Sequence, residues 1–430
     1  MIRIKTQFII NMNSFLISHN HKDCTGCSAC MNVCSHQAIT MKEDSEGFLY
    51  PFIDIEKCVD CGLCLKVCPM NGNTQKVTSG FQHIFLSKPI SSNYYLHSAT
   101  IGVCTMLTEL FLKNGDYVFG SALDEVSWTT KHIGICNIQD VNKIRGSKYF
   151  QSDLQNTFSE VKELLKKKRK VLYIGTPCQI AGLKAFLRKT YENLYTIDLI
   201  CHGTFSHKFF KKEVEYWEAK YKGKMSNFSF RNKKVGLGGV VSFDITKPDG
   251  NYKSYIWPAA YSPIYRCFTA NGDGLYYNLR ESCYSCRFHE PERYGDLTAG
   301  DAWGIKEKRP DLFDKESNSK GIALLFANSE KGANLLKMLS NYISFDEITQ
   351  EDAFSQPALV PCNDSVPNER KRLYDNLDVL DYESLVESVL YVDFNKLQSA
   401  YIKKVRTEKV KKIIKKIIKK IIRYTKHDYN

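Results

Sequence analysis

Two runs of cysteine near the N-terminus constrain this chain more than any other feature. In each run, two residues lie between the first and second cysteines and between the second and third. Three residues lie between the third cysteine and the fourth. Such spacing lets a tight loop hold three corners of one cubane, while the fourth thiolate starts the next helix and points at a neighbouring cluster. The runs consist of Cys24, Cys27, Cys30 and Cys34, and of Cys58, Cys61, Cys64 and Cys68.

This spacing is typical of bacterial ferredoxins and predicts two [4Fe-4S] clusters. The exchange of the fourth ligand groups Cys24, Cys27, Cys30 and Cys68 at one cluster, and Cys58, Cys61, Cys64 and Cys34 at the other. Structural zinc usually takes two separated ligand pairs, and disulfides need an oxidising compartment. Four cysteines within each short run favour iron–sulfur clusters over both.

Composition and charge narrow the class of protein further. The 430 residues suggest two to three domains, and cluster-bearing thiols favour a reducing, cytoplasmic compartment. We find no secretory signal and no stretch of 18 apolar residues that could span a bilayer. The net charge of +13 is concentrated in residues 401–430, so the rest of the chain is not a nucleic-acid-binding surface by charge.

The predicted fold class is α+β, with a small two-cluster ferredoxin module before a larger α/β domain that has added β-strands and a C-terminal amphipathic helix. Residues 71–80 form a polar linker. The expected parts are an extension over 1–22, the ferredoxin module over 23–70, an N-terminal α/β part over 81–205, a C-terminal part over 206–400 and a basic tail over 401–430.

Hydrophobic periodicity places the main elements. The predicted helices are 102–113, 152–168, 177–187, 207–221 and 331–339. The predicted strands are 38–41, 47–53, 117–122, 131–138, 171–175, 194–200, 322–328 and 343–348, with further β-structure over 228–256 that includes a turn at 236–239. Strands that alternate with helices indicate a sheet with crossover connections.

A second group of cysteines is predicted in the large domain. Cys178 falls in the first turn of a helix, where free N–H groups stabilise a thiolate, and Cys201 ends the next strand. In a parallel sheet these two positions meet at one edge, and Cys283 and Cys286 can complete a four-thiolate site for a third [4Fe-4S] cluster. The alternatives are a buried or reactive Cys178 and a zinc or dithiol site at the C-x2-C pair.

Six ordered motifs within residues 145–304 resemble the coenzyme F420 hydrogenase/dehydrogenase beta-subunit family. The motifs are Arg145-Gly-Ser-Lys-Tyr149, Gln151-Ser-Asp153, Gly175-Thr-Pro-Cys-Gln179, Asp198-Leu-Ile-Cys-His-Gly203, Ser282-Cys-Tyr-Ser-Cys286 and Gly300-Asp-Ala-Trp-Gly304. The resemblance implies iron–sulfur clusters, a flavin (FAD or FMN), and electron exchange with a deazaflavin or another small carrier. Bacterial relatives with a fused ferredoxin module are associated with surface-polysaccharide biosynthesis.

The resemblance also implies which residues hold the flavin. The helix start after Gly175 can hold a cofactor phosphate, Lys148 can pair with phosphate or flavin charge, and His202 can donate a proton, although an ordinary structural hydrogen bond explains Lys148 and His202 equally well. The turn over 98–104 has one glycine where the family usually has two. The implied cofactor-binding residues are Ser98, Gly102, Arg145, Gly146, Ser147, Lys148, Gly175, Thr176, Pro177 and Gln179, and the implied catalytic residues are His202 and Lys148.

Three functions follow from these features. The first is an iron–sulfur, flavin-dependent oxidoreductase that acts on a small substrate or electron carrier, with a redox protein as a possible partner. The second is an electron-delivery or scaffold subunit without flavin, and the third is a zinc-dependent binding protein. The remaining cysteines 104, 136, 267 and 362 are interpreted as buried apolar residues.

The basic tail has a separate interpretation. Pairs of isoleucine recur every four residues over 413–422 among lysines, which is helical spacing. Such a helix suits peripheral contact with the anionic inner face of a membrane, or packs its isoleucine stripe on the protein body.

Overall fold

The computed structural model describes residues 22–72, 76–77, 82–90, 98–233, 240–258, 261–268, 276–314, 321–360, 365–403 and 407. The N-terminal extension before Lys22, much of the linker, the turn predicted at 236–239 and nearly all of the basic tail lie outside these ranges. Within the described residues, no helix has the length and apolar character needed to cross a bilayer.

The ferredoxin module is a small hairpin with two short helices. The helices α3 (Ala29–Val33) and α4 (Leu63–Lys66) each contain the third cysteine of a run, and η1 (Pro69–Asn71) ends the module. The strands β1 (Ile39–Glu43) and β2 (Leu49–Ile53) pair antiparallel, as predicted, with Ile39 opposite Ile53.

A mixed sheet forms the centre of the large domain. Its strands are β3 (His83–Ser87), β4 (Tyr117–Asp124), β5 (Thr129–Ile135), β6 (Ser152–Asp153), β7 (Val171–Gly175), β8 (Leu194–Leu199), β12 (Leu297–Asp301), β13 (Ala323–Ala327) and β14 (Asp346–Glu347). The order is β14-β3-β13-β12-β8-β7-β4-β5-β6, and the four strands β12, β8, β7 and β4 run parallel. Their carboxyl ends therefore meet at one edge.

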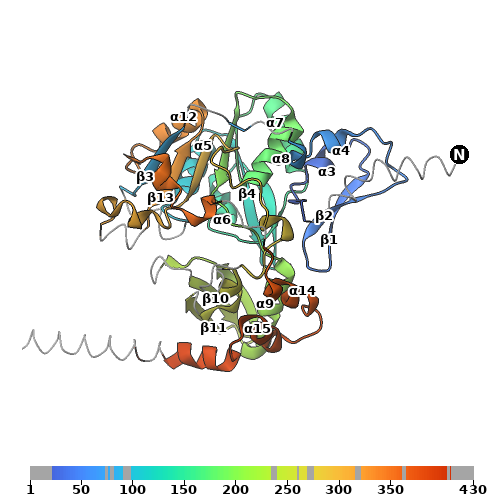
Figure 1. Cartoon of the computed structure of the whole chain (residues 1–430), viewed down its shortest axis with the longest axis vertical. Helices are drawn as coiled ribbons and strands as arrows, with labels where there is room; N and C mark the ends of the chain where they lie inside the picture. The colour runs from blue at the N-terminus through green and yellow to red at the C-terminus, as the bar shows by residue number, and fades with distance from the viewer. Residues whose placement is uncertain are drawn as a thin grey trace, which may run out of the picture.

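Helices cover both faces of this sheet (Figure 1). Helices α5 (Val103–Lys113) and α12 (Glu330–Met338) lie on one face, and α7 (Thr157–Lys166) and α8 (Pro177–Leu187) lie on the other beside the ferredoxin module. Successive side chains of a strand point to opposite faces. Accordingly, Leu172 joins the core under α5, whereas Tyr173 joins the core under α8.

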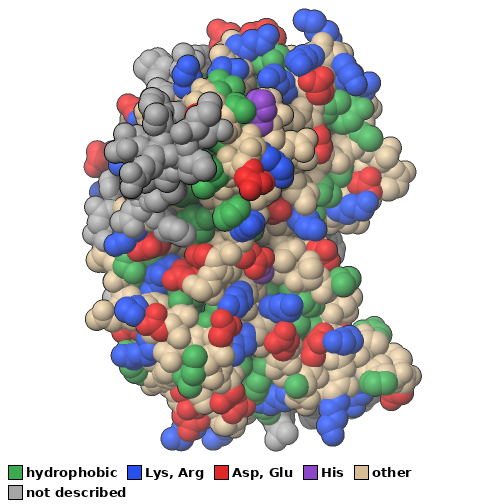
Figure 2. Space-filling model, turned by 90° about the vertical axis from the view of Figure 1, so that its right-hand side faces the viewer, with side chains coloured by type: hydrophobic (Ala, Val, Ile, Leu, Met, Phe, Trp, Pro, Cys, Tyr) green, Lys and Arg blue, Asp and Glu red, His purple; other side chains and the backbone are tan. Residues whose placement is uncertain are grey.

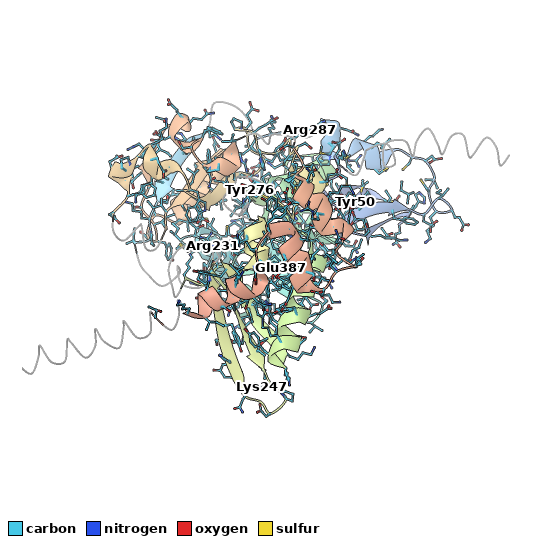
Figure 3. All side chains as sticks on the ribbon, turned by 60° about the horizontal axis from the view of Figure 1, so that its bottom comes forward. Tyr50, Arg231, Lys247, Tyr276, Arg287 and Glu387 are labelled. Carbon is cyan, nitrogen blue, oxygen red and sulfur yellow. The ribbon has the colours of Figure 1, made fainter. Side chains whose placement is uncertain are left out.

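A second, aromatic-rich unit lies below the main sheet in Figure 1. It contains α9 (His207–Tyr221), β9 (Lys224–Ser229), β10 (Val240–Thr246), β11 (Tyr252–Pro258), α10 (Pro263–Phe268), α14 (Asn368–Asp375) and α15 (Tyr382–Leu390). The three strands form an antiparallel sheet in the order β11-β10-β9. Lys247 lies at the tip of the β10–β11 hairpin, far from the main sheet (Figure 3).

Short elements connect these units. They are η3 (Ile138–Asp140), α6 (Val141–Ile144), η7 (Glu281–Cys283), η8 (Ile305–Glu307), η9 (Pro310–Leu312), α13 (Gln350–Ala353) and η10 (Pro357–Leu359).

The predicted α+β class is confirmed, and one predicted helix needs correction. The helix expected over 152–168 begins five residues later, because Ser152 and Asp153 pair with Thr130 and Lys131 of β5 and extend the sheet. The strand expected over 343–348 is only β14.

The ferredoxin module is anchored to the body by polar contacts. In the β1–β2 turn, Glu46 forms a bidentate ion pair with Arg370 of α14, and Ser206 Oγ donates to the Glu46 carbonyl at 2.5 Å. At α3, the Asn32 side chain donates to the Gln155 carbonyl at 2.8 Å. On the face that carries the module, acidic and basic side chains are interspersed (Figure 2).

Candidate functional site

The two cysteine runs repeat the same backbone geometry. Gly26 and Asp60 occupy equivalent positions and have φ of 68° and 54°, and Ser28 and Gly62 have φ of 57° and 68°. These left-handed residues flank the second cysteine of each run, so that the loop curls and the following helix turns inward. Each loop thus encloses a small hollow.

The cysteines line these hollows in the two sets that the exchanged fourth ligand predicts. One hollow is lined by Cys24, Cys27, Cys30 and Cys68, and the other by Cys34, Cys58, Cys61 and Cys64. We call the sites at these hollows the inner and outer cluster sites, respectively. Cys27 is buried at the inner site, and Cys61 is exposed at the outer site.

A third group of cysteines gathers where the parallel strands end. Gly203 follows β8, and its N–H donates to Cys201 Sγ at 3.4 Å. A Cβ atom on Gly203 would lie 3.2 Å from Cys283 Cβ, so these two cysteines flank the same glycine. Burial raises the pKa of the Cys286 thiol, and the neighbouring thiols Cys283, Cys178 and Cys201 raise it further. The four predicted ligands of the third cluster therefore lie in one region.

Cys178 differs from its prediction in one respect. Its position at the start of α8 predicted a stabilised thiolate. Desolvation instead raises the pKa of Cys178 to about 11, although the Thr176 hydroxyl, 3.2 Å from its sulfur, acts in the opposite direction. A free Cys178 would therefore be protonated at neutral pH, which disfavours a reactive low-pKa thiol. Metal coordination would deprotonate it.

These cysteines are not arranged as a single-ion site. Among the described residues, no group of three or more His, Cys, Asp or Glu side chains has the geometry of one metal ion. A cubane is larger than one ion, and its four thiolate ligands stand correspondingly farther apart. The grouping of these four half-buried cysteines fits a cluster of that size.

The inner cluster site and the third cysteine group meet across α8. Gly182 packs against the inner loop so closely that a Cβ atom there would lie 2.9 Å from Cys27 Sγ. Cys178 starts the same helix, and its thiol is close enough to add to the rise in the pKa of Cys27, which is caused mainly by burial. Glycine at 182 therefore allows the inner cluster site and the third cysteine group to lie close to each other.

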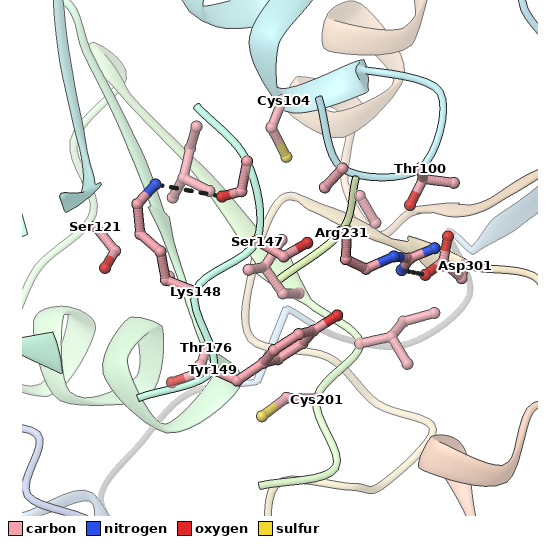
Figure 4. Close-up of a pocket in the computed structure, with 18 of the residues that line it drawn as sticks. Thr100, Cys104, Ser121, Ser147, Lys148, Tyr149, Thr176, Cys201, Arg231 and Asp301 are labelled. Carbon is pink, nitrogen blue, oxygen red and sulfur yellow. Dashed lines mark hydrogen bonds and ion pairs between the residues drawn. The ribbon is translucent and has the colours of Figure 1, made fainter. Parts of the chain in front are cut away.

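A cavity of about 460 Å³ opens at the carboxyl ends of β7, β8 and β12 (Figure 4). Cys201 lines this cavity, so the third cysteine group adjoins it. Ser98 and Pro177, both predicted to bind the cofactor, are buried and do not line it. The predicted cofactor-binding and catalytic residues that line the cavity are Gly102, Arg145, Gly146, Ser147, Lys148, Gly175, Thr176, Gln179 and His202.

Two helices open onto this cavity. Helix α5 begins after Gly102, whose φ of 95° favours glycine, and α8 begins after Thr176, whose N–H donates to Gln179 Oε1 at 2.9 Å. Gly146, with φ of 84°, also lines the wall. Helix N-termini present free N–H groups that bind phosphate. The cavity thus fits an anionic, phosphate-bearing cofactor.

Lys148 lies in the wall of the cavity. Its Nζ donates to the carbonyls of Arg145 at 2.8 Å and Gly146 at 3.3 Å. Burial lowers the pKa of Lys148 to about 7. The side chain therefore loses its proton more readily than an exposed lysine does, and an anion bound beside it would favour the charged ammonium.

His202 lies among aromatic rings. Its ring centroid is 4.5 Å from that of Phe268, 5.4 Å from that of Tyr276 and 6.5 Å from that of Tyr149. Burial lowers the pKa of His202 to about 4, so the imidazole is neutral at pH 7. It can donate only from a neutral ring N–H, and the tilted rings around it form an apolar wall.

Sequence reasoning missed several polar residues of the cavity. Arg231, which follows β9, forms an ion pair with Asp301 at the end of β12. His132 of β5 contacts Ser152 Oγ at 2.8 Å and the Ile174 carbonyl at 3.0 Å. Arg231 and His132 come from segments that are distant from each other in sequence, and no local spacing indicates that they meet at the cavity.

One acidic residue of the family motifs, Asp198, is structural. It is fully buried, pairs with Arg293 at 3.3 Å and accepts hydrogen bonds from the N–H groups of Tyr294 and Gly295. The residue thereby ties β8 to the segment that follows Cys286. The close packing requires glycine at 295, where a Cβ atom would lie 2.5 Å from the Asp198 nitrogen.

The remaining cysteines only partly match their interpretation. Cys267 is buried, as expected. Cys104 is half-buried and lines the cavity, and Cys136 is exposed because it directly follows the end of β5. Cys362 lies outside the described residues.

Comparisons with known proteins agree with this geometry. Residues 168–351 match the family model for the C-terminal part of the coenzyme F420 hydrogenase/dehydrogenase beta subunit, and residues 23–71 match the model for a 4Fe-4S dicluster domain. The chain thus combines a segment that matches a 4Fe-4S dicluster domain with a segment that matches the C-terminal part of the coenzyme F420 hydrogenase/dehydrogenase beta subunit. This pair of domains supports an iron–sulfur oxidoreductase.

One solved structure and the curated proteins complete the comparisons. A chain of the F420-reducing [NiFe] hydrogenase complex from Methanosarcina barkeri is 15% identical, with a TM-score of 0.37. The match covers 66% of this chain and 91% of that chain. The search of curated proteins gave no match.

Proposed function

We propose that the protein passes electrons along the outer and inner clusters to a third [4Fe-4S] cluster, and through a flavin to a small substrate or deazaflavin-like carrier. The third cluster would be held by Cys178, Cys201, Cys283 and Cys286. One observation carries the proposal: Cys201 lines the large cavity, while Cys178 shares a helix with the glycine that packs on Cys27. The third cysteine group thus lies between the inner site and the cavity.

The residues around the cavity have distinct tasks in this proposal. The N-termini of α5 and α8 and the Lys148 ammonium hold the cofactor phosphate. The ring wall of Tyr149, His202 and Phe268 excludes water and faces the planar part of the cofactor. A bound flavin would supply the change between one-electron and two-electron transfer.

Iron counting tests the third cluster. Anaerobically reconstituted protein should contain about twelve irons with matching acid-labile sulfide, since each cluster has about four. A Cys283→Ser, Cys286→Ser double variant should lose about four irons and keep the signals of the other two clusters.

A matched control is Cys136→Ser, because Cys136 is exposed and belongs to none of the predicted ligand sets. It should keep all of its iron. A double variant with a full iron content, or wild-type protein that never exceeds two clusters, would refute the third cluster.

A second candidate function is an electron-delivery subunit without flavin. The observation that favours it is the turn before α5, where Gly102 is the one glycine and the buried Ser98 does not line the cavity. Denaturation of the flavoprotein should release a yellow fluorescent cofactor. If none is released and added flavin does not bind, the delivery subunit is the better description.

Partners and location extend this proposal. A small redox protein would exchange electrons at the outer cluster, whose Cys61 is exposed. A cytoplasmic location, peripheral membrane contact through residues 401–430 and a role in surface-polysaccharide biosynthesis stay predictions. Comparing vesicle binding by the full chain and by a chain truncated after residue 402 tests the membrane contact.

A further inference from the structure

A buried arginine lies between the inner cluster site and the third cysteine group. Arg280 is 1% exposed, and its Nε donates to the Cys24 carbonyl at 2.8 Å. Its Nη1 donates to the Leu49 carbonyl and to Gln151 Oε1, both at 3.1 Å. The guanidinium therefore contacts the loop that would hold the inner cluster.

The same residue is joined to the third cysteine group through the backbone. Arg280 is the residue before η7, and the Cys283 N–H donates to the Arg280 carbonyl at 2.9 Å. The Arg280 N–H in turn donates to the Thr204 carbonyl at 2.8 Å, three residues after Cys201. The positive charge of Arg280 also acts on the thiols of Cys178 and Cys283.

Within the part of the chain that the structure describes, no carboxylate forms an ion pair with Arg280. All of its hydrogen bonds to described residues go to neutral oxygens, and its Nη2 has no partner among those residues. The guanidinium lies over the Tyr50 ring, with 3.9 Å between the Cζ atom and the ring centroid. A buried cation without a counter-charge is costly, so the fold retains it where negative charge is expected nearby.

We propose that Arg280 is the shared counter-cation of the inner and third clusters. Clusters with four thiolate ligands are anions, and each reduction adds one negative charge. A cation between them raises both reduction potentials and weakens the repulsion between two reduced clusters. Arg280 is thus a positioning residue that lets electrons occupy neighbouring clusters. The inference rests on the proposed third cluster.

Redox titration followed by electron paramagnetic resonance tests this role in the reconstituted full chain. In Arg280→Gln, the equilibrium constants for reduction of the inner and third clusters should each fall about tenfold, or about 59 mV for one electron. The outer cluster should keep its potential. Arg280→Lys retains the charge without the planar fork, and should recover most of the shift.

Two further variants separate the effect of the Arg280 charge from its contribution to the docking of the ferredoxin module. Gln151→Glu places a carboxylate beside the intact guanidinium, and should lower the same two potentials even if Arg280→Gln fails to assemble. Arg372→Gln is the control, since Arg372 of α14 donates to the Ser388 carbonyl at 2.9 Å and its charge does not act on the thiols of Cys178 and Cys283. It should leave all three potentials near their wild-type values.

The outcomes distinguish this inference from the proposed function. Wild-type protein with two clusters refutes the third cluster itself. If three clusters assemble and Arg280→Gln and Gln151→Glu leave the potentials unchanged, Arg280 is not the counter-cation. If Arg280→Lys shifts them as much as Arg280→Gln does, the hydrogen bonds and not the charge carry the effect.

Discussion

Lys148 makes cofactor binding sensitive to pH. Its pKa of about 7 means that the ammonium is charged below this pH and neutral above it. An anionic phosphate is attracted only to the charged form, so flavin affinity should fall as the pH rises above 7, by up to about tenfold per pH unit for one linked proton. Flavin titration of deflavinated protein between pH 6 and 9 measures this.

The Lys148→Met variant should bind flavin weakly and without this pH dependence. Lys143→Met is the control, because Lys143 is an exposed lysine of α6 that pairs with Asp140 at 2.7 Å. It should follow the wild-type curve. A Lys148→Met protein with an unchanged pH profile would exclude Lys148 as the phosphate partner.

Position 182 requires glycine because a side chain there would press on the loop that holds Cys27. Alanine normally stabilises a helix by about 1 kcal/mol relative to glycine. In Gly182→Ala, however, the new Cβ would press on Cys27, 2.9 Å away, and displace the inner loop. We expect a loss of up to about four irons and of the inner-cluster signal, with the outer-cluster signal intact. Full inner-cluster occupancy in this variant would show that the loop can yield.

At the residue level, spacing grouped the cysteines of the two runs into the sets that line the two hollows, because cluster ligands follow one another along a loop. Arg280 and Gly182 could not be predicted in this way. Their importance comes from contacts with Cys24 and Cys27, more than 150 positions away in the sequence. A single sequence contains no signal for such pairs.

At the level of elements, strongly patterned segments were predicted with their observed bounds. Val171–Gly175, Pro177–Leu187 and His207–Tyr221 are examples, since an apolar strand, Pro177 and the capping Ser206 mark their ends. The strand Leu297–Asp301 was missed, although it lies in the centre of the sheet. Its small residues are set by packing, because a Cβ on Gly300 would lie 2.6 Å from Ile200.

The Glu46–Arg370 ion pair should strengthen the docking of the β1–β2 turn. Replacing Arg370 by Met removes its bidentate contact with Glu46 and its 2.8 Å hydrogen bond to the Leu279 carbonyl. Hydrogen bonds to charged groups contribute about 1.5–3 kcal/mol, so the unfolding free energy should fall by that order. Hydrogen exchange should increase in the hairpin over 39–53.

A double variant isolates the pair. Glu46→Gln combined with Arg370→Met should cost less than the sum of the single changes, because each single change leaves a partner unpaired. Additive costs would mean that the two side chains do not stabilise each other.

At the scale of the whole molecule, chain topology places the third cysteine group beside the inner cluster site. Strands β7 and β8 bring Cys178 and Cys201 to one edge, and the chain returns through Cys283 and Cys286 before β12 enters the sheet beside β8. The parallel neighbourhood of Cys178 and Cys201 was predictable from alternating strands and helices. The contact between α8 and the inner loop was not, because nothing in the sequence fixes how the ferredoxin module docks.

The order of the cluster sites predicts that loss of the outer cluster slows reduction by a protein donor more than reduction by dithionite. Cys61 is an exposed ligand of the outer site. Cys61→Ser should therefore remove about four irons from the outer site and leave the inner and third clusters in place. A reduced ferredoxin-type protein should then reduce the third cluster at least about tenfold more slowly than in wild-type protein, because its docking point for electrons is lost. Dithionite is a small ion that can enter the cavity beside Cys201, so it should still reduce the third cluster. Stopped-flow absorption with both donors measures these rates, and equal slowing with both donors would contradict an ordered path that begins at the outer cluster.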